Sequence, residues 1–263
     1  MKRYLATVQY IGKNYSGYQR QDNGTSIQQV IEESLESVFK QKVEVFASGR
    51  TDAGVNAYAQ TIHFDADITI PAKKIPLAVN IVLPDDIKFL SCKEVSSDFN
   101  ARFDVKKKTY EYSMYVSNVM LPTKEYSYWL KKMPDIEKMK ACAKIICGKH
   151  DFRAFMSTGS QAKTFERTVY SIKIKQKKNE IIIDITGNGF LYNMVRIIVG
   201  TLIEVGYGKK TIDDVKNALN SKKRKYAGYL VPPYALFLKE VKYWYKTIIK
   251  NIKKLVDKVP KLL

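Results

Sequence analysis

The residues best suited to chemistry lie in one short segment, Ser48-Gly49-Arg50-Thr51-Asp52-Ala53-Gly54. The carboxylate of Asp52 can act as a nucleophile or as a general base. Arg50, two residues earlier, can keep that carboxylate ionised or bind a phosphate. Because Asp and Gly also favour turns, an ordinary polar turn is the alternative interpretation of this segment.

Two alternating segments flank this loop and predict a β-hairpin. Residues 43–47 alternate before it, and residues 58–64 alternate after it, with Tyr58, Gln60, Ile62 and Phe64 on one face. The two glycines allow the tip of the hairpin to fold tightly and to approach a ligand. The sequence therefore predicts that Asp52 lies at the tip of a hairpin.

The elements around this hairpin occur in an order that repeats once along the chain. The first half is predicted to contain a strand at 2–11, a helix beginning at Ser26, the hairpin, a short helix at 72–82 and a strand at 87–95. The second half is predicted to contain a strand at 108–116, a helix around 136–146, a hairpin of 169–175 with 180–186, helices at 191–205 and 212–219, and a strand at 235–243.

Two copies of βαββαβ predict an α+β fold built from two ferredoxin-like halves. We expect these halves to form a continuous, mostly antiparallel sheet, with helices on one face and a central active-site cleft. The expected domains are an N-terminal half at 1–104, a C-terminal half at 105–246 and a basic tail at 247–263. The tail is expected either to be a solvated helix or to touch RNA.

The amino-acid composition of the chain limits which classes of binding partner and which compartment are expected. The chain has 263 residues, 45% of them hydrophobic, and a formal net charge of +19. This charge favours a polyanion, first nucleic acid and second an anionic membrane, although general lysine abundance is an alternative explanation. Three cysteines without a CxxC pair argue against disulfides and a zinc site. This cysteine usage fits a reducing cytoplasm, where we expect the protein. No apolar run is long enough to span a bilayer, and the N-terminus lacks a signal-peptide core.

Two further residues stand out because of their surroundings. Tyr110 shares one face of its strand with Tyr112, and such a tyrosine either belongs to the core or stacks on a reacting base. Arg196 lies in the almost wholly apolar run 191–200. A charge in such a run is costly unless it is paired, so Arg196 either forms a structural salt bridge or serves a site.

Three motifs, in this order, resemble those of the tRNA pseudouridine synthase A family (TruA). They are Gly-Arg-Thr-Asp-Ala-Gly-Val at 49–55, Ala101-Arg102-Phe103 followed by Lys108-Thr109-Tyr110-Glu111-Tyr112, and Met194-Val195-Arg196 followed by Ile198-Val199-Gly200. Weaker matches at 17–21, 150–155 and 232–238 extend the resemblance from about residue 4 to residue 243.

The resemblance implies isomerisation of uridine to pseudouridine at positions 38 to 40 of the tRNA anticodon stem-loop. It assigns Asp52 as the nucleophile, Tyr110 as the residue that stacks on the target uracil, and Arg196 as the partner of Asp52. Arg50 would fill or support the space that the flipped base leaves. Attack at C1′ and abstraction of the 2′ proton both stay open. No cofactor and no metal are expected, and the family works as a homodimer on tRNA.

Two positions depart from the family pattern. Asn56 and Asn100 stand where the family usually has histidine. Neither is the nucleophile, so we expect activity to survive while target position or affinity changes.

Two rival functions are weaker. A non-catalytic RNA-binding protein would need the aromatic pattern of an RNA-recognition domain, which is not found, and it leaves Asp52 and Arg196 unexplained. A glycoside hydrolase would need two carboxylates on either side of one bond, and Asp65 and Asp67 lie a strand's length away from Asp52.

Overall fold

The computed structural model describes residues 1–22, 24–159 and 162–244. The chain divides into two compact units. Unit 1 contains residues 1–106 together with the described residues from Glu240 onward, and unit 2 contains residues 107–239. The basic tail expected at 247–263 lies outside the described residues. No helix in the described part of the chain is both long and apolar enough to cross a membrane.

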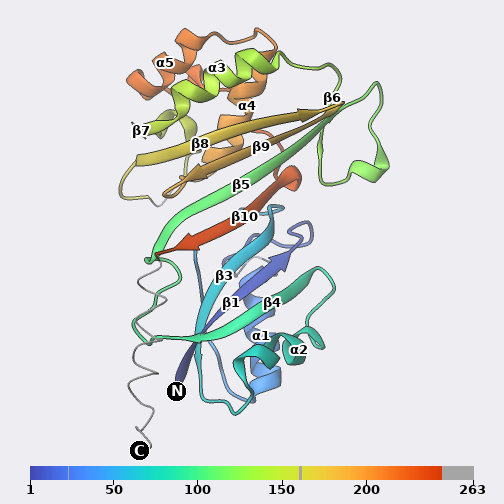
Figure 1. Cartoon of the computed structure of the whole chain (residues 1–263), viewed down its shortest axis with the longest axis vertical. Coiled ribbons are helices and arrows are strands. Elements are labelled where there is room, and N and C mark those ends of the chain that lie inside the picture. The colour runs from blue at the N-terminus through green and yellow to red at the C-terminus, as the bar shows by residue number, and fades with distance from the viewer. Residues whose placement is uncertain (23, 160–161, 245–263) are drawn as a thin grey trace, which may run out of the picture. The chain divides into compact units, whose positions relative to one another are not determined.

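Unit 1 has the strand order of a ferredoxin-like half (Figure 1). Its elements are β1 (Lys2–Tyr10), α1 (Ile27–Phe39), β2 (Val45–Ala47), β3 (Asn56–Ala66), a 3-10 turn (Ala72–Lys74), α2 (Ile75–Asn80) and β4 (Ile87–Val95). The strands run in the order β4-β1-β3-β2, and all neighbours are antiparallel. Helix α2 packs on β4, and α1 contacts both α2 and β2.

Helix α1 begins where its sequence predicts. The Oγ of Ser26 accepts a hydrogen bond from the backbone N–H of Gln29 at 3.2 Å, which satisfies one of the free donors of the first turn. The side chain of Gln29 bonds to Glu33 instead of returning to Ser26, so only half of the expected capping box forms. Ile27, Ile31 and Leu35 are spaced at helical intervals and are fully buried.

A hydrophobic cluster of buried residues in unit 1 consists of Leu5, Val95, Phe99 and Ala101, and Tyr243 packs against it. The hydroxyl of Tyr243 is 2.5 Å from Thr61 Oγ1 and donates to the Ala101 carbonyl at 2.9 Å. The segment that follows β4 is therefore anchored by both apolar contacts and hydrogen bonds.

Unit 2 repeats the pattern with additions. Its elements are β5 (Val105–Val116, in this unit from residue 107), β6 (Tyr128–Leu130), α3 (Ile136–Ile146), β7 (Gly148–Asp151), β8 (Glu166–Lys177), β9 (Glu180–Gly187), α4 (Met194–Gly206), α5 (Ile212–Ser221) and β10 (Leu236–Tyr243, in this unit up to residue 239). The strand order is β10-β5-β9-β8-β7, and β6 pairs in parallel with β5. Helix α3 contacts α4, α5 and β8.

These elements confirm the α+β class, and several boundaries differ from those expected. The strand expected at 43–47 pairs only at 45–47, and the helix expected at 72–82 is a 3-10 turn followed by α2. Helix α4 begins at Met194 rather than at residue 191, because Asn193 adopts a left-handed conformation with φ of 60°. The short strands β6 and β7 were not expected. The continuous sheet and the central cleft stay predictions.

Candidate active site

Asp52 lies in the loop between β2 and β3, as the hairpin pattern predicts. The register pairs Val45 with Phe64 and Ala47 with Ile62, and the Ser48 N–H donates to the Thr61 carbonyl at 2.8 Å. The loop then turns at Asp52, whose carbonyl accepts the Val55 N–H at 3.1 Å. The Asp52 residue itself is half-buried. It is thus held at a defined place while remaining accessible.

Buried side chains of β1 and β3 form hydrogen bonds to this loop. The hydroxyl of Tyr10, on β1, is 2.7 Å from Thr51 Oγ1. The amide of Gln60, on β3, accepts from Ser48 Oγ at 2.6 Å and donates to the Gly49 carbonyl at 2.8 Å. Buried polar groups that are hydrogen-bonded in this way favour a single arrangement, so the residues that lead into Asp52 are held in place.

The first loop of the chain packs against the Asp52 loop. The Tyr18 N–H donates to the Thr51 carbonyl at 3.0 Å, and the Gly12 N–H donates to Asn56 Oδ1 at 2.8 Å. A Cβ at Gly12 would lie 2.2 Å from the Val55 carbonyl oxygen, so only glycine permits this approach. Asn56, one of the two departures from the family pattern, therefore joins the two loops.

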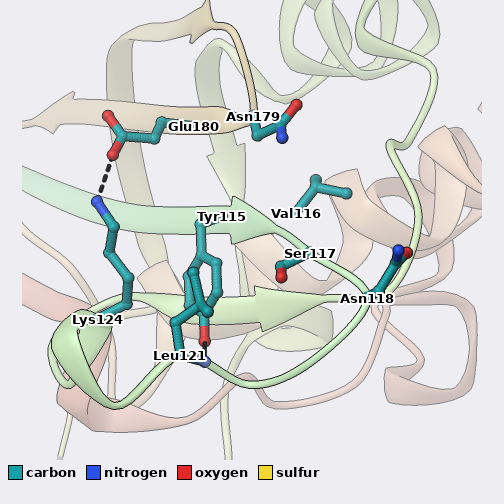
Figure 2. A pocket seen from close by; sticks show the side chains of 8 residues that line it. All are labelled: Tyr115, Val116, Ser117, Asn118, Leu121, Lys124, Asn179 and Glu180. Atoms are coloured by element: carbon teal, nitrogen blue, oxygen red, sulfur yellow. Dashed lines mark hydrogen bonds and ion pairs between the residues drawn. The ribbon is translucent and has the colours of Figure 1, made fainter.

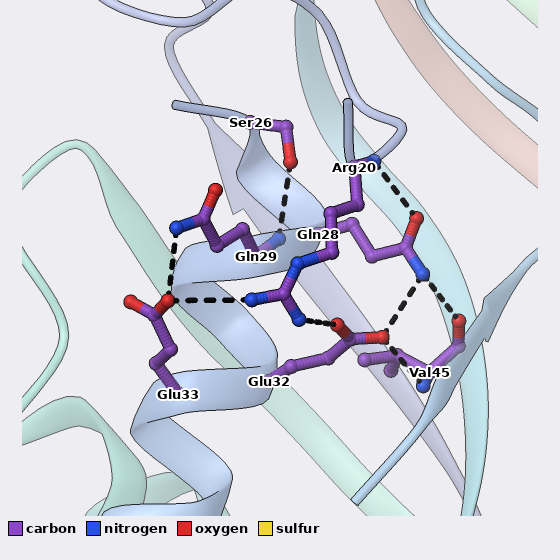
Figure 3. Close-up of polar contacts among 7 residues, drawn as sticks. All are labelled: Arg20, Ser26, Gln28, Gln29, Glu32, Glu33 and Val45. Atoms are coloured by element: carbon purple, nitrogen blue, oxygen red, sulfur yellow. Dashed lines mark hydrogen bonds and ion pairs between the residues drawn. The ribbon is translucent and has the colours of Figure 1, made fainter. Parts of the chain in front are cut away.

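Arg20, in the same first loop, has a structural role (Figure 3). Its guanidinium is 3.0 Å from one oxygen of Glu32 and 3.5 Å from Glu33. The other oxygen of Glu32 accepts the Val45 N–H at 3.1 Å and the Gln28 side chain at 2.9 Å. This buried carboxylate joins the first loop, α1 and the start of β2, so it helps to set the strand that leads into the Asp52 loop.

Arg50 is an exposed residue on the same loop as Asp52. Neighbouring protein atoms and, secondly, the positive charge of Arg102 lower the pKa of its guanidinium below the ordinary value. Arg50 and Arg102 are thus two cationic side chains of unit 1 whose charges repel each other.

Unit 2 contains the other two candidate residues. Tyr110 on β5 is buried, and its ring meets the ring of Phe190 edge-on, with centroids 5.3 Å apart. Arg196 lies in the first turn of α4. Its Nε donates to the Val231 carbonyl at 2.8 Å and its Nη1 donates to Asn193 Oδ1 at 2.7 Å. These bonds orient the guanidinium in a largely apolar helix.

Tyr112 is a neighbour of Arg196 that was not proposed for the site. Its hydroxyl donates to the Pro232 carbonyl at 3.0 Å, next to the carbonyl that Arg196 binds. Burial raises the pKa of Tyr112 well above its ordinary value, and the charge of Arg196 acts in the opposite direction. The alternation of Tyr110 and Tyr112 along one strand face was the sequence signal that could have identified it.

The structure thus places Asp52 and Arg50 on one loop of unit 1, and Tyr110 and Arg196 in unit 2. The meeting of these two pairs in one site stays a prediction.

Unit 2 also contains a pocket of about 420 Å³, which none of the four candidate residues lines (Figure 2). It is lined by the end of β5, the loop after it and the β8–β9 turn, and the Lys124–Glu180 ion pair lies at its edge. Among the described residues, no group of three or more His, Cys, Asp or Glu side chains could hold a metal ion.

Comparisons with known proteins agree with the motifs. A family model described as tRNA pseudouridine synthase matches residues 6–104 and 142–244. A tRNA pseudouridine synthase A of Anoxybacillus flavithermus is 41% identical over 244 residues, which covers 92% of this chain and 99% of that protein. The tRNA pseudouridine synthase A of Thermoanaerobacter sp. is also 41% identical, and tRNA pseudouridine synthase A 2 of Clostridium perfringens is 42% identical; each match covers 92% of this chain and all of the relative.

The solved structures that match this chain do so with low TM-scores and low sequence identity. A crystal structure of the archaeal box H/ACA sRNP Nop10-Cbf5 complex gives a TM-score of 0.32 at 10% identity, covering 88% of this chain and 58% of that chain. A Cbf5-Nop10-Gar1 complex gives a TM-score of 0.35 at 9% identity, covering 88% and 59%. Likeness at this level carries no weight for function. The sequence relatives match along nearly their whole length, and on that ground the chain belongs to the tRNA pseudouridine synthase A family of enzymes.

Proposed function

We propose that this enzyme converts uridine to pseudouridine at positions 38 to 40 in the anticodon stem-loop of tRNA, with Asp52 as the nucleophile. The observation that carries the proposal is the match to relatives named tRNA pseudouridine synthase A along nearly their whole length. The Asp52 loop supports it, because Asp52 is half-buried and hydrogen bonds hold the residues that precede it.

The reaction breaks the N1–C1′ bond of uridine and forms a C5–C1′ bond. The proton on C5 is lost, and N1 takes up a proton, so the product is an isomer of the substrate. The Asp52 carboxylate can attack C1′ and later leave, or it can take the 2′ proton and return it. Both routes need an ionised carboxylate close to the sugar.

The other candidate residues have roles suited to their chemistry. Arg196 keeps Asp52 ionised and oriented, because an opposite charge nearby favours the charged form of a carboxyl group. Tyr110 stacks on the uracil, which must leave the stem before it can react. Arg50 occupies or supports the space that the base vacates.

The partners follow from the same proposal. The substrate is tRNA, and the charge of +19 supplies phosphate contacts without reading sequence. The enzyme acts as a homodimer in the cytoplasm. Light scattering during size-exclusion chromatography tests the dimer, and a monomer that is fully active would contradict it.

The reaction is tested with unmodified tRNA that carries tritium at C5 of uracil, because bonding at C5 releases that tritium to water. We expect release by the wild-type enzyme and none by Asp52→Asn, with similar tRNA affinity for both. Asp85→Asn is the matched control, since Asp85 is a fully exposed carboxylate of the same unit and should keep wild-type activity.

The position is tested with tRNAs that hold a single uridine at 38, 39 or 40. Release from at least one of these, and from none that lacks uridine at all three, supports the anticodon stem-loop. Modification of a uridine elsewhere would show that Asn56 and Asn100 accompany a change of target. No release from any tRNA, with binding preserved, would favour an RNA-binding protein without catalysis.

A further inference from the structure

The turn that follows β4 presents two exposed side chains from a rigid base. Asn100 Oδ1 accepts the N–H groups of Arg102 and Phe103 at 2.9 and 3.2 Å. The Asn100 N–H donates to Asp104 Oδ2 at 2.8 Å, and the Asp104 N–H returns to the Asn100 carbonyl at 3.0 Å. A turn closed by four such bonds has little freedom, so the directions of residues 102 and 103 are fixed.

The base of this turn is anchored to the hairpin that carries Asp52. Ala101 is fully buried, and its N–H donates to His63 Nδ1 on β3 at 3.1 Å. The His63 ring stacks on Phe46 of β2, with centroids 5.0 Å apart. The Ala101 carbonyl accepts from Tyr243. The turn is therefore joined to both strands of the hairpin on which the Asp52 loop is built.

The two exposed side chains form a unit of their own. Phe103 is 78% exposed, and the Arg102 guanidinium carbon lies 5.7 Å from the centroid of its ring. A single exposed apolar residue is common on protein surfaces. An exposed phenylalanine on a capped turn, paired with an arginine, is instead the combination that nucleic-acid-binding proteins use for bases and phosphates.

We propose that Phe103 stacks on a base of the tRNA and that Arg102 binds a phosphate beside it. This inference rests on the proposed function and adds two substrate-binding residues to it. Arg50 fits this inference, because burial and, secondly, the charge of Arg102 lower the pKa of its guanidinium, and an RNA phosphate would offset the repulsion between these two cations. It also gives Asn100 a role, since that residue holds the turn.

Stacking is tested by measuring tRNA affinity for three substitutions of Phe103. We expect Phe103→Ala to weaken binding about tenfold or more. Phe103→Trp should restore binding because it keeps a flat aromatic ring, whereas Phe103→Leu should not. Leu77→Ala is the matched control, since Leu77 is a 72% exposed apolar residue of the same unit and should bind as the wild type does. Equal affinity of the wild type and Phe103→Ala, or full rescue by leucine, would overturn the stacking role.

The phosphate contact is tested by the salt dependence of binding. Arg102→Gln should lower the slope of log affinity against log salt by about one, and the exposed Lys73→Gln should leave it unchanged. An unchanged slope in Arg102→Gln would overturn the contact. If the wild type releases tritium and these variants bind normally, only this inference fails. If the wild type releases no tritium while Phe103→Ala still weakens binding, the proposed reaction fails and the RNA contact stands.

Discussion

At the residue scale, the two departures from the family pattern have different structural roles. Asn56 is fully buried and joins the first loop to the start of β3 through the Gly12 N–H. Asn100 caps an exposed turn of the same unit. In both residues, the side-chain amide oxygen accepts hydrogen bonds from backbone N–H groups. The sequence identified these positions as unusual, but only their hydrogen-bond partners show what they do.

Replacing Asn56 should loosen the Asp52 loop. In Asn56→Ala, the buried Gly12 N–H loses its acceptor, and we expect the free energy of unfolding to fall by about 1–3 kcal/mol. The turnover number should also fall, because the first loop supports the backbone around Asp52. Urea unfolding and tritium release measure the two effects. Asn14→Ala, at an exposed position of the same loop, is the control, and an equal loss of stability there would contradict the assigned role.

At the element scale, periodicity predicted most of the long helices and strands. Helical spacing of buried residues identifies α1 and α3, and alternation identifies β5, because each must bury one face. The three- and four-residue strands β6 and β7 carry too few residues for a period, and their pairing is decided by neighbouring strands. Likewise, Met194 begins α4 because Asn193 binds Arg196 and Ser157 in a left-handed conformation, which an apolar pattern does not encode.

The candidate site, like the fold, could be predicted from the sequence only in part. The Asp52 hairpin was predicted from alternation and glycine, and the motifs led to the family that the relatives confirm. The supporting bonds from Tyr10, Gln60 and Glu32 could not be predicted, since they join segments far apart in the chain. Such contacts depend on the register of the strands rather than on any local pattern.

The link between β3 and the turn at Ala101 should make stability depend on pH. His63 Nδ1 accepts a hydrogen bond, so the ring must be unprotonated on that atom. Burial, and secondly the charge of Arg3, lower its pKa below 6.5, while Asp65 and Asp104 partly oppose this shift. In the unfolded chain His63 binds a proton near its ordinary pKa. The free energy of unfolding should therefore fall as pH drops below about 6.5, until the lowered folded pKa is reached.

This dependence is measured by urea unfolding between about pH 7.5 and pH 5.5, the range in which histidine ordinarily titrates. His63→Gln keeps a possible acceptor for the Ala101 N–H but cannot titrate, so its stability should change less over this range. A wild-type profile that matches that of His63→Gln would contradict the prediction.

The start of β10 is held in unit 2 by an ion triad. Lys239 Nζ is 2.7 Å from Glu111 of β5 and 2.9 Å from Asp184 of β9. Lys239→Met leaves two largely buried carboxylates without their shared cation, and we expect the free energy of unfolding to fall by about 1–3 kcal/mol. Lys242→Met removes an exposed pair with Glu240 on the same strand, and it should cost less than about 1 kcal/mol. Equal losses would show that the triad adds nothing.

At the scale of the whole molecule, we expect salt to change the KM for tRNA strongly and the turnover number only slightly. In the proposed function, the excess of lysine and arginine binds phosphates along the tRNA, whereas bond breaking depends on Asp52. Raising salt from about 50 to 200 mM should therefore increase KM steeply, about a thousandfold if six phosphates are contacted. The turnover number at saturating tRNA should change little, because salt weakens binding before the chemical step.

This separation distinguishes a protein that uses its charge for tRNA from one that is basic for other reasons. If lysine abundance were incidental, few phosphates would be contacted, and KM would respond weakly to salt despite the charge of +19. If salt instead lowered the turnover number at saturating tRNA, surface charges would be acting in the chemical step, and the assignment of that step to Asp52 would need revision. Initial rates of tritium release over a matrix of tRNA and salt concentrations decide between these outcomes, with Asp52→Asn as the blank.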